Sequence, residues 1–210
     1  MLDANTITAL QDRTTAAWHE PNAPVEAISG IQTELLPLIE SQHRANFDLW
    51  HEEDEARDPG ATDGSIATVK RAIDRLNQRR NDLVEKIDVM LLGELQPVFE
   101  RNPSASLHSE TPGMMIDRLS ILALKIFHTR EEAERETATE AHRQKNRERV
   151  ALLEEQRGDL AAALTTLNQE MLAGLRRFKL YRQMKMYNDP ELNPAIYQRR
   201  TKAPKTGSVS

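Results

Sequence analysis

The sequence predicts an all-α protein, either an elongated antiparallel four-helix bundle or a coiled-coil-like bundle, with disordered tails. Three observations predict this fold class. Apolar residues recur at spacings of three and four along the chain, which is the helical period. Charged residues make up 29% of the 210-residue chain, as expected for helices with wide solvated faces. Only eight glycines are present, and signals for sheet are absent.

The pattern divides the chain into three parts. We expect a polar segment over residues 1–24, a helical bundle domain over residues 25–190 and a basic disordered tail over residues 191–210. The first part contains proline breakers and is expected to be partly ordered. Its apolar residues predict a short docking helix and are Ile7, Leu10 and Trp18.

The first long helix is expected between residues 25 and 58. Pro37 should kink or split it, and the run Asp58-Pro59-Gly60 should end it. A second helix follows, capped by Asp63 or Ser65, and it has the most regular stripe in the chain. The stripe consists of Ile66, Val69, Ile73, Leu76, Arg80, Leu83, Ile87 and Met90.

A loop is expected from Pro97, and the pair Thr111-Pro112 then predicts a third helix. Threonine is a good N-cap, and proline suits the first helical position. No glycine or proline separates this helix from the next. We expect a turn at residues 137–140, where threonines offer caps, and a fourth helix from there to about Tyr187. One unbroken helix through the turn is the alternative.

The absence of cysteine excludes disulfide frameworks, thiolate nucleophiles and cysteine-bound metals, and it favours a cytoplasmic location. No apolar run approaches the roughly 20 residues of a transmembrane span, and no signal peptide is recognisable. From Arg176 onward there are nine basic and two acidic residues, so the tail either docks on an acidic partner or stays solvated. Too few aromatic residues are present for a nucleic-acid platform, and we expect no nucleic-acid partner.

Two arginines interrupt the apolar stripes, Arg80 in the second helix and Arg157 in the fourth. A buried guanidinium needs a carboxylate partner, because an unpaired buried charge is strongly destabilising. Candidate partners are Asp117 on the third helix and the acidic cluster after Trp50. We therefore expect a polar layer inside the bundle, which either fixes the register of the helices or forms a binding pocket.

A pocket for an anion or a nucleotide sugar is favoured over acid–base catalysis, for which the candidates are His51 and Asp54. The ligand-binding candidates are Trp50, Glu53, Lys70, Arg71, Asp74, Asn77, Arg80, Asp117 and Arg118. We expect no metal and no cofactor. The pairs His51 with Asp54 and His128 with Glu132 have ligand-like spacing, but the Glu-x-x-His repeat of carboxylate-bridged bundles is absent.

Four segments carry a family resemblance: NFDLWHEEDEARDP at residues 46–59, KRAIDRLNQRRNDLVEKID at 70–88, ETPGMMIDRLSILALKIFH at 110–128 and KMYNDPELNP at 185–194. They resemble a bacterial family catalogued as domain of unknown function 4254. That family has no established reaction, and its members look like helical proteins often encoded beside glycosyltransferases of envelope-polysaccharide assembly. Its motif positions correspond here to Trp50, His51, Glu53, Asp54, Arg57, Lys70, Arg71, Asp74, Asn77, Arg80, Asp82, Glu85, Asp88, Asp117 and Arg118.

Two functions follow as expectations. The first is a non-catalytic cytoplasmic protein that acts through a protein partner, such as a glycosyltransferase of envelope-polysaccharide assembly, and that could form oligomers. The second is an enzyme or small-ligand binder that holds an anionic sugar or nucleotide through Arg80, Arg118 and Lys70. A solvent-connected cavity that reaches Arg80, His51 and Asp117 would favour the second function, whereas a closed, fully paired layer would favour the first.

Overall fold

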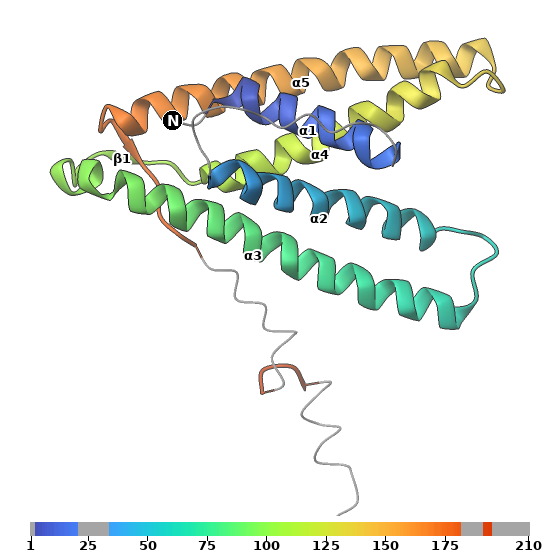
Figure 1. Ribbon diagram of the computed structural model, residues 1–210, viewed down its shortest axis with the longest axis horizontal. Helices are drawn as coiled ribbons and strands as arrows, with labels where there is room; N and C mark the ends of the chain where they lie inside the picture. The colour runs from blue at the N-terminus through green and yellow to red at the C-terminus, as the bar shows by residue number, and fades with distance from the viewer. Residues whose placement is uncertain (1–2, 21–33, 182–190, 195–210) are drawn as a thin grey trace, which may run out of the picture. The chain divides into compact units, whose positions relative to one another are not determined.

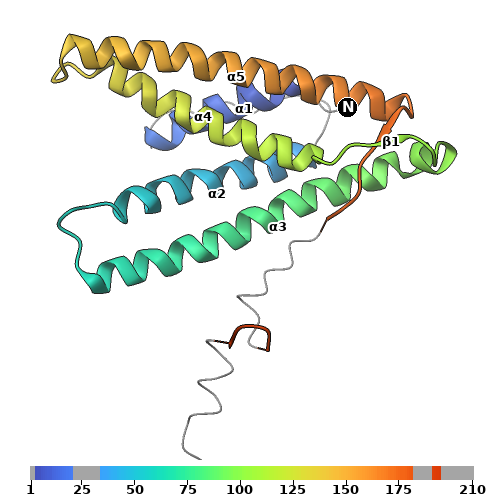
Figure 2. The same ribbon diagram turned by 180° about the vertical axis from the view of Figure 1, so that it is seen from behind.

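The computed structural model describes residues 3–20, 34–181 and 191–194, and it confirms that the protein is all-helical (Figures 1 and 2). Within these residues lie five helices and one pair of two-residue strands. The helices are α1 (Ala4–His19), α2 (Leu35–Glu55), α3 (Asp63–Arg101), α4 (Pro112–Glu134) and α5 (Glu140–Leu172), and the strands are β1 (Ser106–Leu107) and β2 (Arg176–Arg177).

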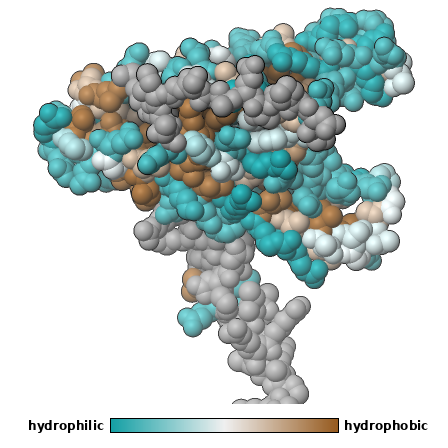
Figure 3. Space-filling view, in the orientation of Figure 1, coloured by the Kyte–Doolittle hydropathy of each residue, from teal (hydrophilic) through white to brown (hydrophobic). Residues whose placement is uncertain are grey.

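The helices form two hairpins, α2–α3 and α4–α5, and α1 packs against α2, α4 and α5 (Figure 1). The core lies where the hairpins meet and includes Ile39, Ile87, Ile116, Leu119 and Leu164. Hydrophilic residues cover the loop end of the α4–α5 hairpin (Figure 3). Across the part of the chain that the structure describes, no helix combines the length and the apolar character that crossing a bilayer requires.

Helix α1 belongs to the core. Its N-cap residue Asp3 accepts hydrogen bonds from the backbone N–H groups of Asn5 and Thr6. Sequence patterns predicted only a docking helix here, because several of its inward positions are polar. Gln11 is fully buried, for example, and its Nε2 donates to the carbonyl of Ile116 at 3.2 Å. The apolar positions that α1 adds to the core are Ala4, Ile7 and Leu10.

Prolines break neither α2 nor α3. Helix α2 begins at Leu35, so Pro37 lies in the first turn, where its missing N–H would have no partner in the helix. The expectation of a loop from Pro97 is wrong, because α3 continues through this proline for one more turn, to Arg101. Phe99 in that turn packs edge-on against Phe178, with ring centroids 6.0 Å apart. The residues before Glu34 in the expected first long helix lie outside the described residues.

Two predicted boundaries are confirmed and two are wrong. The N-cap of α3 is Thr62, not Asp63 or Ser65, and its Oγ1 accepts a hydrogen bond from the backbone N–H of Ser65 at 3.2 Å. Thr111 caps α4, which starts at Pro112, and Thr139 caps α5, so the alternative of one unbroken helix is excluded. Helix α5 ends at Leu172, well before the expected end near Tyr187. Gly174 follows with a φ of 71°, a conformation that glycine adopts without strain and that commonly ends helices. β2 then pairs in parallel with β1.

The chain divides into one unit up to Leu180 and a second from Tyr181 onward. In the second unit the structure describes only Tyr181 and residues 191–194. Most of the expected basic tail therefore lies outside the described residues.

Asp88 on α3 fixes the start of α4. Its Oδ1 accepts a hydrogen bond from the backbone N–H of Gly113 at 2.7 Å, and its Oδ2 accepts one from the hydroxyl of Thr111. The negative charge lies at the positive end of the helix dipole. Burial nevertheless raises the pKa of Asp88 to about 6, and the bonds from Thr111 and Gly113 oppose that rise.

Gly113→Ala should destabilise the protein, because an added Cβ would lie 2.8 Å from both Asp88 Oδ1 and the carbonyl oxygen of Val84. We expect a loss of about 1–3 kcal/mol in the free energy of unfolding, as for other overpacked sites. Gly158→Ala in α5 is the matched control, because nothing lies within 4 Å of its added Cβ. It should stabilise by roughly 0.5–1 kcal/mol. Urea unfolding measures both changes, and equal effects would contradict the close packing of α3 on α4.

Candidate functional site

A partly buried carboxylate, Asp117 of α4, organises the polar layer between α2, α3 and α4. It accepts hydrogen bonds from Gln42 Nε2 at 2.6 Å and from Asn46 Nδ2 at 2.9 Å. Arg80 Nε of α3 lies 3.9 Å from the same oxygen, which confirms the predicted pairing of this arginine. Burial raises the pKa of Asp117, whereas Arg80 and the two amides lower it.

The layer continues through His43 to α1. His43 is fully buried, with Nδ1 2.7 Å from Ser120 Oγ and Nε2 2.8 Å from Thr15 Oγ1. Asn46 joins the two halves, because its Nδ2 also donates to Ser120 Oγ at 2.8 Å. Burial lowers the pKa of His43 to about 4, so the imidazole is neutral at neutral pH. This part of the layer ties α1, α2 and α4 together.

The second stripe arginine, Arg157 of α5, does not join this layer. Its Nη1 lies 2.5 Å from Asp12 Oδ1 of α1. Neither Asp117 nor the acidic cluster after Trp50 is therefore its partner. The ion pair links α5 to α1, an element whose place in the core the sequence did not predict.

A cavity of about 360 Å³ lies against the outer side of the polar layer. Its lining residues come from α2 and the turn after it, from α3 and from α4, and are Asn46, Leu49, Trp50, Glu53, Asp54, Arg57, Arg80, Ile121 and Leu124. Asp54 and Arg57 are exposed, so the cavity reaches the surface. Arg80 is partly buried, and its Nε makes no hydrogen bond with any residue that the structure describes. The cavity thus connects solvent to the guanidinium that pairs with Asp117.

The cavity combines three kinds of chemistry. Trp50 supplies an aromatic wall, Glu53 and Asp54 supply carboxylates, and Arg80 supplies a guanidinium. Arg57 Nη1 lies 2.8 Å from Glu53 Oε2, which neutralises part of the negative charge at the rim. A guanidinium recognises phosphate or carboxylate, carboxylates accept hydrogen bonds from hydroxyls, and an indole face packs against a ring.

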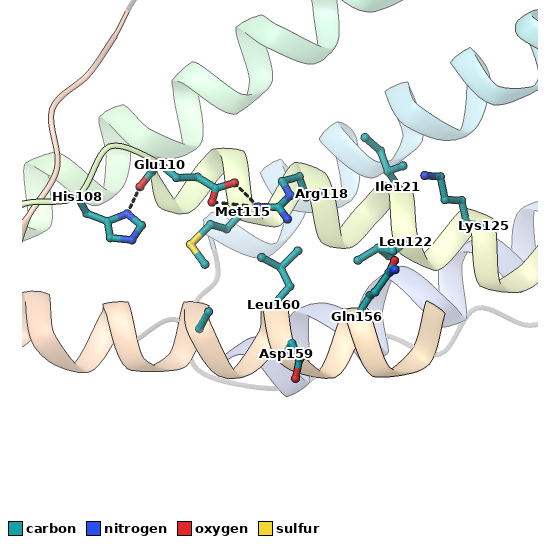
Figure 4. A pocket seen from close by; sticks show the side chains of 11 residues that line it. His108, Glu110, Met115, Arg118, Ile121, Leu122, Lys125, Gln156, Asp159 and Leu160 are labelled. Carbon is teal, nitrogen blue, oxygen red and sulfur yellow. Dashed lines mark hydrogen bonds and ion pairs between the residues drawn. The ribbon is translucent and has the colours of Figure 1, made fainter. Parts of the chain in front are cut away.

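The other predicted ligand-binding residues do not line this cavity. Lys70 and Asp74 form an exposed ion pair along α3, where Arg71 is also exposed and Asn77 is partly buried. Arg118 lies in a second cavity of about 680 Å³ between α4 and α5 (Figure 4). There it points toward Glu110, with Nη1 2.8 Å from Oε1. The structure therefore brings Trp50, Glu53, Asp54, Arg80 and Asp117 together, and separates Arg118 from Arg80.

Three histidines from three helices meet beside this cavity: His19 at the end of α1, His51 in α2 and His128 in α4. Their ring nitrogens lie within 4.8 Å of one another. Trp50 links the cluster to the cavity, because it lines the cavity and stacks on His128 with ring centroids 4.9 Å apart. These three imidazoles are the residues that could hold a metal ion, which the sequence did not lead us to expect.

His51 faces the histidine cluster, whereas Asp54, its predicted acid–base partner, lines the cavity. Burial lowers the pKa of His51, and the neighbouring His19 and His128 lower it further. The charge of Asp54 acts in the opposite direction and raises it. The spacing suggested His128 and Glu132 as a pair of metal ligands. In the structure His128 Nδ1 instead lies 2.8 Å from Glu131 Oε2, and Glu132 Oε2 lies 2.7 Å from His142 Nε2.

Sequence reasoning missed several residues of the layer and of the cluster. Gln42, Asn46 and Ser120 are buried, yet polar residues of these types occur throughout the chain and carry no signal by themselves. His43 lies two positions before the core alanine Ala45, and no spacing rule distinguishes it from the other histidines. His19 belongs to a segment that was expected outside the helical domain. A cluster built from three separate helices leaves no local sequence motif.

The model of a family described as "Protein of unknown function (DUF4254)" matches residues 36–180. This range contains every residue that lines the cavity, and also His51 and His128, whereas His19 precedes it. No curated protein and no solved structure matches the chain.

Proposed function

The chain belongs to the DUF4254 family of proteins of unknown function, and we propose that it binds a small phosphorylated sugar or nucleotide sugar in the cavity between Trp50 and Arg80. The observation that carries the proposal is Arg80: a partly buried guanidinium, anchored by Asp117 at 3.9 Å, lines a cavity that reaches solvent. An arginine that served only to neutralise Asp117 would need no cavity beside it.

Arg80 would hold the phosphate. Its stem is fixed beside the polar layer, so little side-chain entropy is lost on binding, and its Nε has no hydrogen-bond partner among the described residues. The charge of Asp117 is shared with two amides and so leaves part of the Arg80 charge for a ligand.

The rest of the cavity suits a sugar. Glu53 and Asp54 can accept hydrogen bonds from hydroxyl groups, and the face of Trp50 can pack against a sugar ring or a base. A cavity of about 360 Å³ is at the small end of the range for ligand pockets, which favours a compact sugar phosphate as the directly held part. The setting implied by the family resemblance, envelope-polysaccharide assembly in the cytoplasm, agrees with such a ligand.

Thermal unfolding with and without UDP-glucose, a hexose phosphate and inorganic phosphate tests the proposal. A ligand at about 100 times its Kd stabilises by roughly 2.7 kcal/mol, which corresponds to a rise of about 5–10 °C in the midpoint for a chain of this size. Arg80→Met should weaken binding about 10–100-fold, because one charge-assisted contact is lost.

Arg79→Met is the matched control, because Arg79 precedes Arg80 on α3 but is exposed and does not line the cavity. Its ligand-induced shift should equal that of the wild type. If no probe shifts the wild-type midpoint, or if Arg80→Met keeps the full shift, the proposal is wrong. The first outcome would favour the other expectation, a non-catalytic role through a protein partner.

A further inference from the structure

The three-histidine cluster has a geometry close to that of a metal site. The ring nitrogens of His19, His51 and His128 lie within 4.8 Å of one another. Nitrogens bound to one tetrahedral zinc ion lie about 3.3 Å apart, because each Zn–N bond is about 2.0 Å. Small rotations of the three side chains, each on a different helix, would therefore bring them onto one ion.

Two of the imidazoles are oriented for metal binding by the hydrogen bond that the other ring nitrogen makes. His19 Nδ1 lies 2.8 Å from the carbonyl oxygen of Thr15, which can only accept, so Nδ1 carries the proton. His128 Nδ1 lies 2.8 Å from Glu131 Oε2 and donates to that carboxylate in the same way. In the neutral form of both rings, Nε2 then keeps a free lone pair. Metal-bound histidines typically donate their second N–H to a carbonyl or a carboxylate in this manner.

The two Nε2 atoms have no other use within the described part of the chain. Both are buried, and neither has a hydrogen-bond partner there. A buried polar atom without a partner is destabilising, and native proteins rarely retain one without a reason.

We propose that His19, His51 and His128 form a binding site for a divalent transition-metal ion of the zinc type. Three imidazoles suit zinc, cobalt or nickel better than magnesium or calcium, which prefer oxygen ligands. All three residues are partly exposed, and three histidine ligands leave one position of a tetrahedral ion for water or a substrate. Aromatic rings enclose the other side, since Phe127 stacks on His19 at 4.3 Å and Phe47 packs against His51 at 4.5 Å.

The site is distinct from the phosphate position that we assign to Arg80. None of the three histidines lines the cavity, although Trp50, which does, stacks on His128. Metal binding therefore does not depend on the proposed sugar ligand. Arg80→Met, which should impair that ligand, should leave the affinity for metal unchanged.

Cobalt(II) titration of the full chain, treated with a chelator and free of any histidine tag, tests the site. We expect one cobalt ion per chain, visible absorption bands of a four- or five-coordinate ion, and displacement by zinc. His19→Gln and His128→Gln should each weaken binding more than 100-fold. Glu131→Gln should weaken it about 10–100-fold, the usual effect of losing an outer partner of a ligating histidine.

His142→Gln is the matched control, because His142 Nε2 also lies beside a glutamate, Glu132 at 2.7 Å, but outside the cluster. Its cobalt affinity should equal that of the wild type. Circular dichroism shows whether each variant folds. If a histidine variant does not fold, the cobalt affinity of Glu131→Gln tests the site instead, because this substitution changes only an exposed carboxylate. Absence of stoichiometric binding, or equal cobalt affinity in the wild type and Glu131→Gln, would overturn the proposal.

Discussion

Replacing Asp117 with alanine is expected to lower the free energy of unfolding by about 3–5 kcal/mol, the range seen when one partner of a buried charged pair is removed. The carboxylate is the shared acceptor for Gln42 at 2.6 Å and Asn46 at 2.9 Å, and it lies 3.9 Å from Arg80. Alanine would leave Gln42 Nε2 without its acceptor and Arg80 without its carboxylate, whereas Asn46 Nδ2 would keep its bond to Ser120 Oγ. Urea unfolding at neutral pH measures the loss.

Two further variants separate charge from hydrogen bonding at this position. Asp117→Asn keeps an acceptor oxygen but loses the charge that faces Arg80, so its loss of stability should be smaller. Asp74→Ala removes an aspartate of α3 whose ion pair with Lys70 is exposed, and it should change stability little. If Asp117→Ala behaves like Asp74→Ala, the polar layer does not hold α2, α3 and α4 together.

Acidification is expected to destabilise the wild type relative to His43→Gln. The pKa of His43 is about 4 in the folded protein and about 6.5 in the unfolded chain. The folded state thus binds fewer protons in this window, and the stability contributed by the neutral imidazole, present above pH 6.5, is lost as the pH falls to 4. The difference should amount to roughly 3 kcal/mol, since one pKa unit corresponds to about 1.4 kcal/mol.

Asp88 has the opposite effect to His43 on the pH dependence of stability. Its pKa is about 6 in the folded protein, against an ordinary value of 3.8, so the protonated form favours folding and its contribution is lost as the pH rises through 6. The two effects partly cancel in the wild type, and only differences between variants resolve them. Urea unfolding from pH 4 to pH 7 should show His43→Gln gaining on the wild type as the pH falls and Asp88→Asn losing on it. Parallel curves for all three proteins would contradict both assignments.

Much of the helical framework could be predicted because it depends on local chemistry. The stripe of α3, the cap at Thr111 and the turn before Glu140 are each determined by residues close in sequence. The errors have physical reasons as well. Pro97 deprives the carbonyl of Gly93 of its helical donor, yet α3 continues to Arg101 and this last turn packs Phe99 against Phe178. Helix α5 ends at Leu172, just before Gly174, whose positive φ does not continue the helix that the apolar pattern predicts.

The candidate site could be predicted only in part. Arg80 and Asp117 could be paired from sequence because each is a charged residue on an otherwise apolar helical face, a conflict that requires a partner. The sequence could not predict that Arg80 and Arg118 line two different cavities, because this depends on which sides of α4 the neighbouring helices cover. The meeting of His19 with His51 and His128 depends in turn on the docking of α1, whose buried polar residues concealed it.

Fluorescence of Trp50 tests the proposed ligand site most directly, because this side chain lines the cavity and the chain has only one other tryptophan. In a Trp18→Phe protein, all tryptophan emission comes from Trp50. Titration with UDP-glucose or a hexose phosphate should change that emission saturably, and Arg80→Met in the same background should shift the midpoint of the titration about 10–100-fold. Calorimetry that detects binding of these probes while the Trp50 emission stays unchanged, or that detects no binding at all, would contradict the assignment of this cavity as a ligand site.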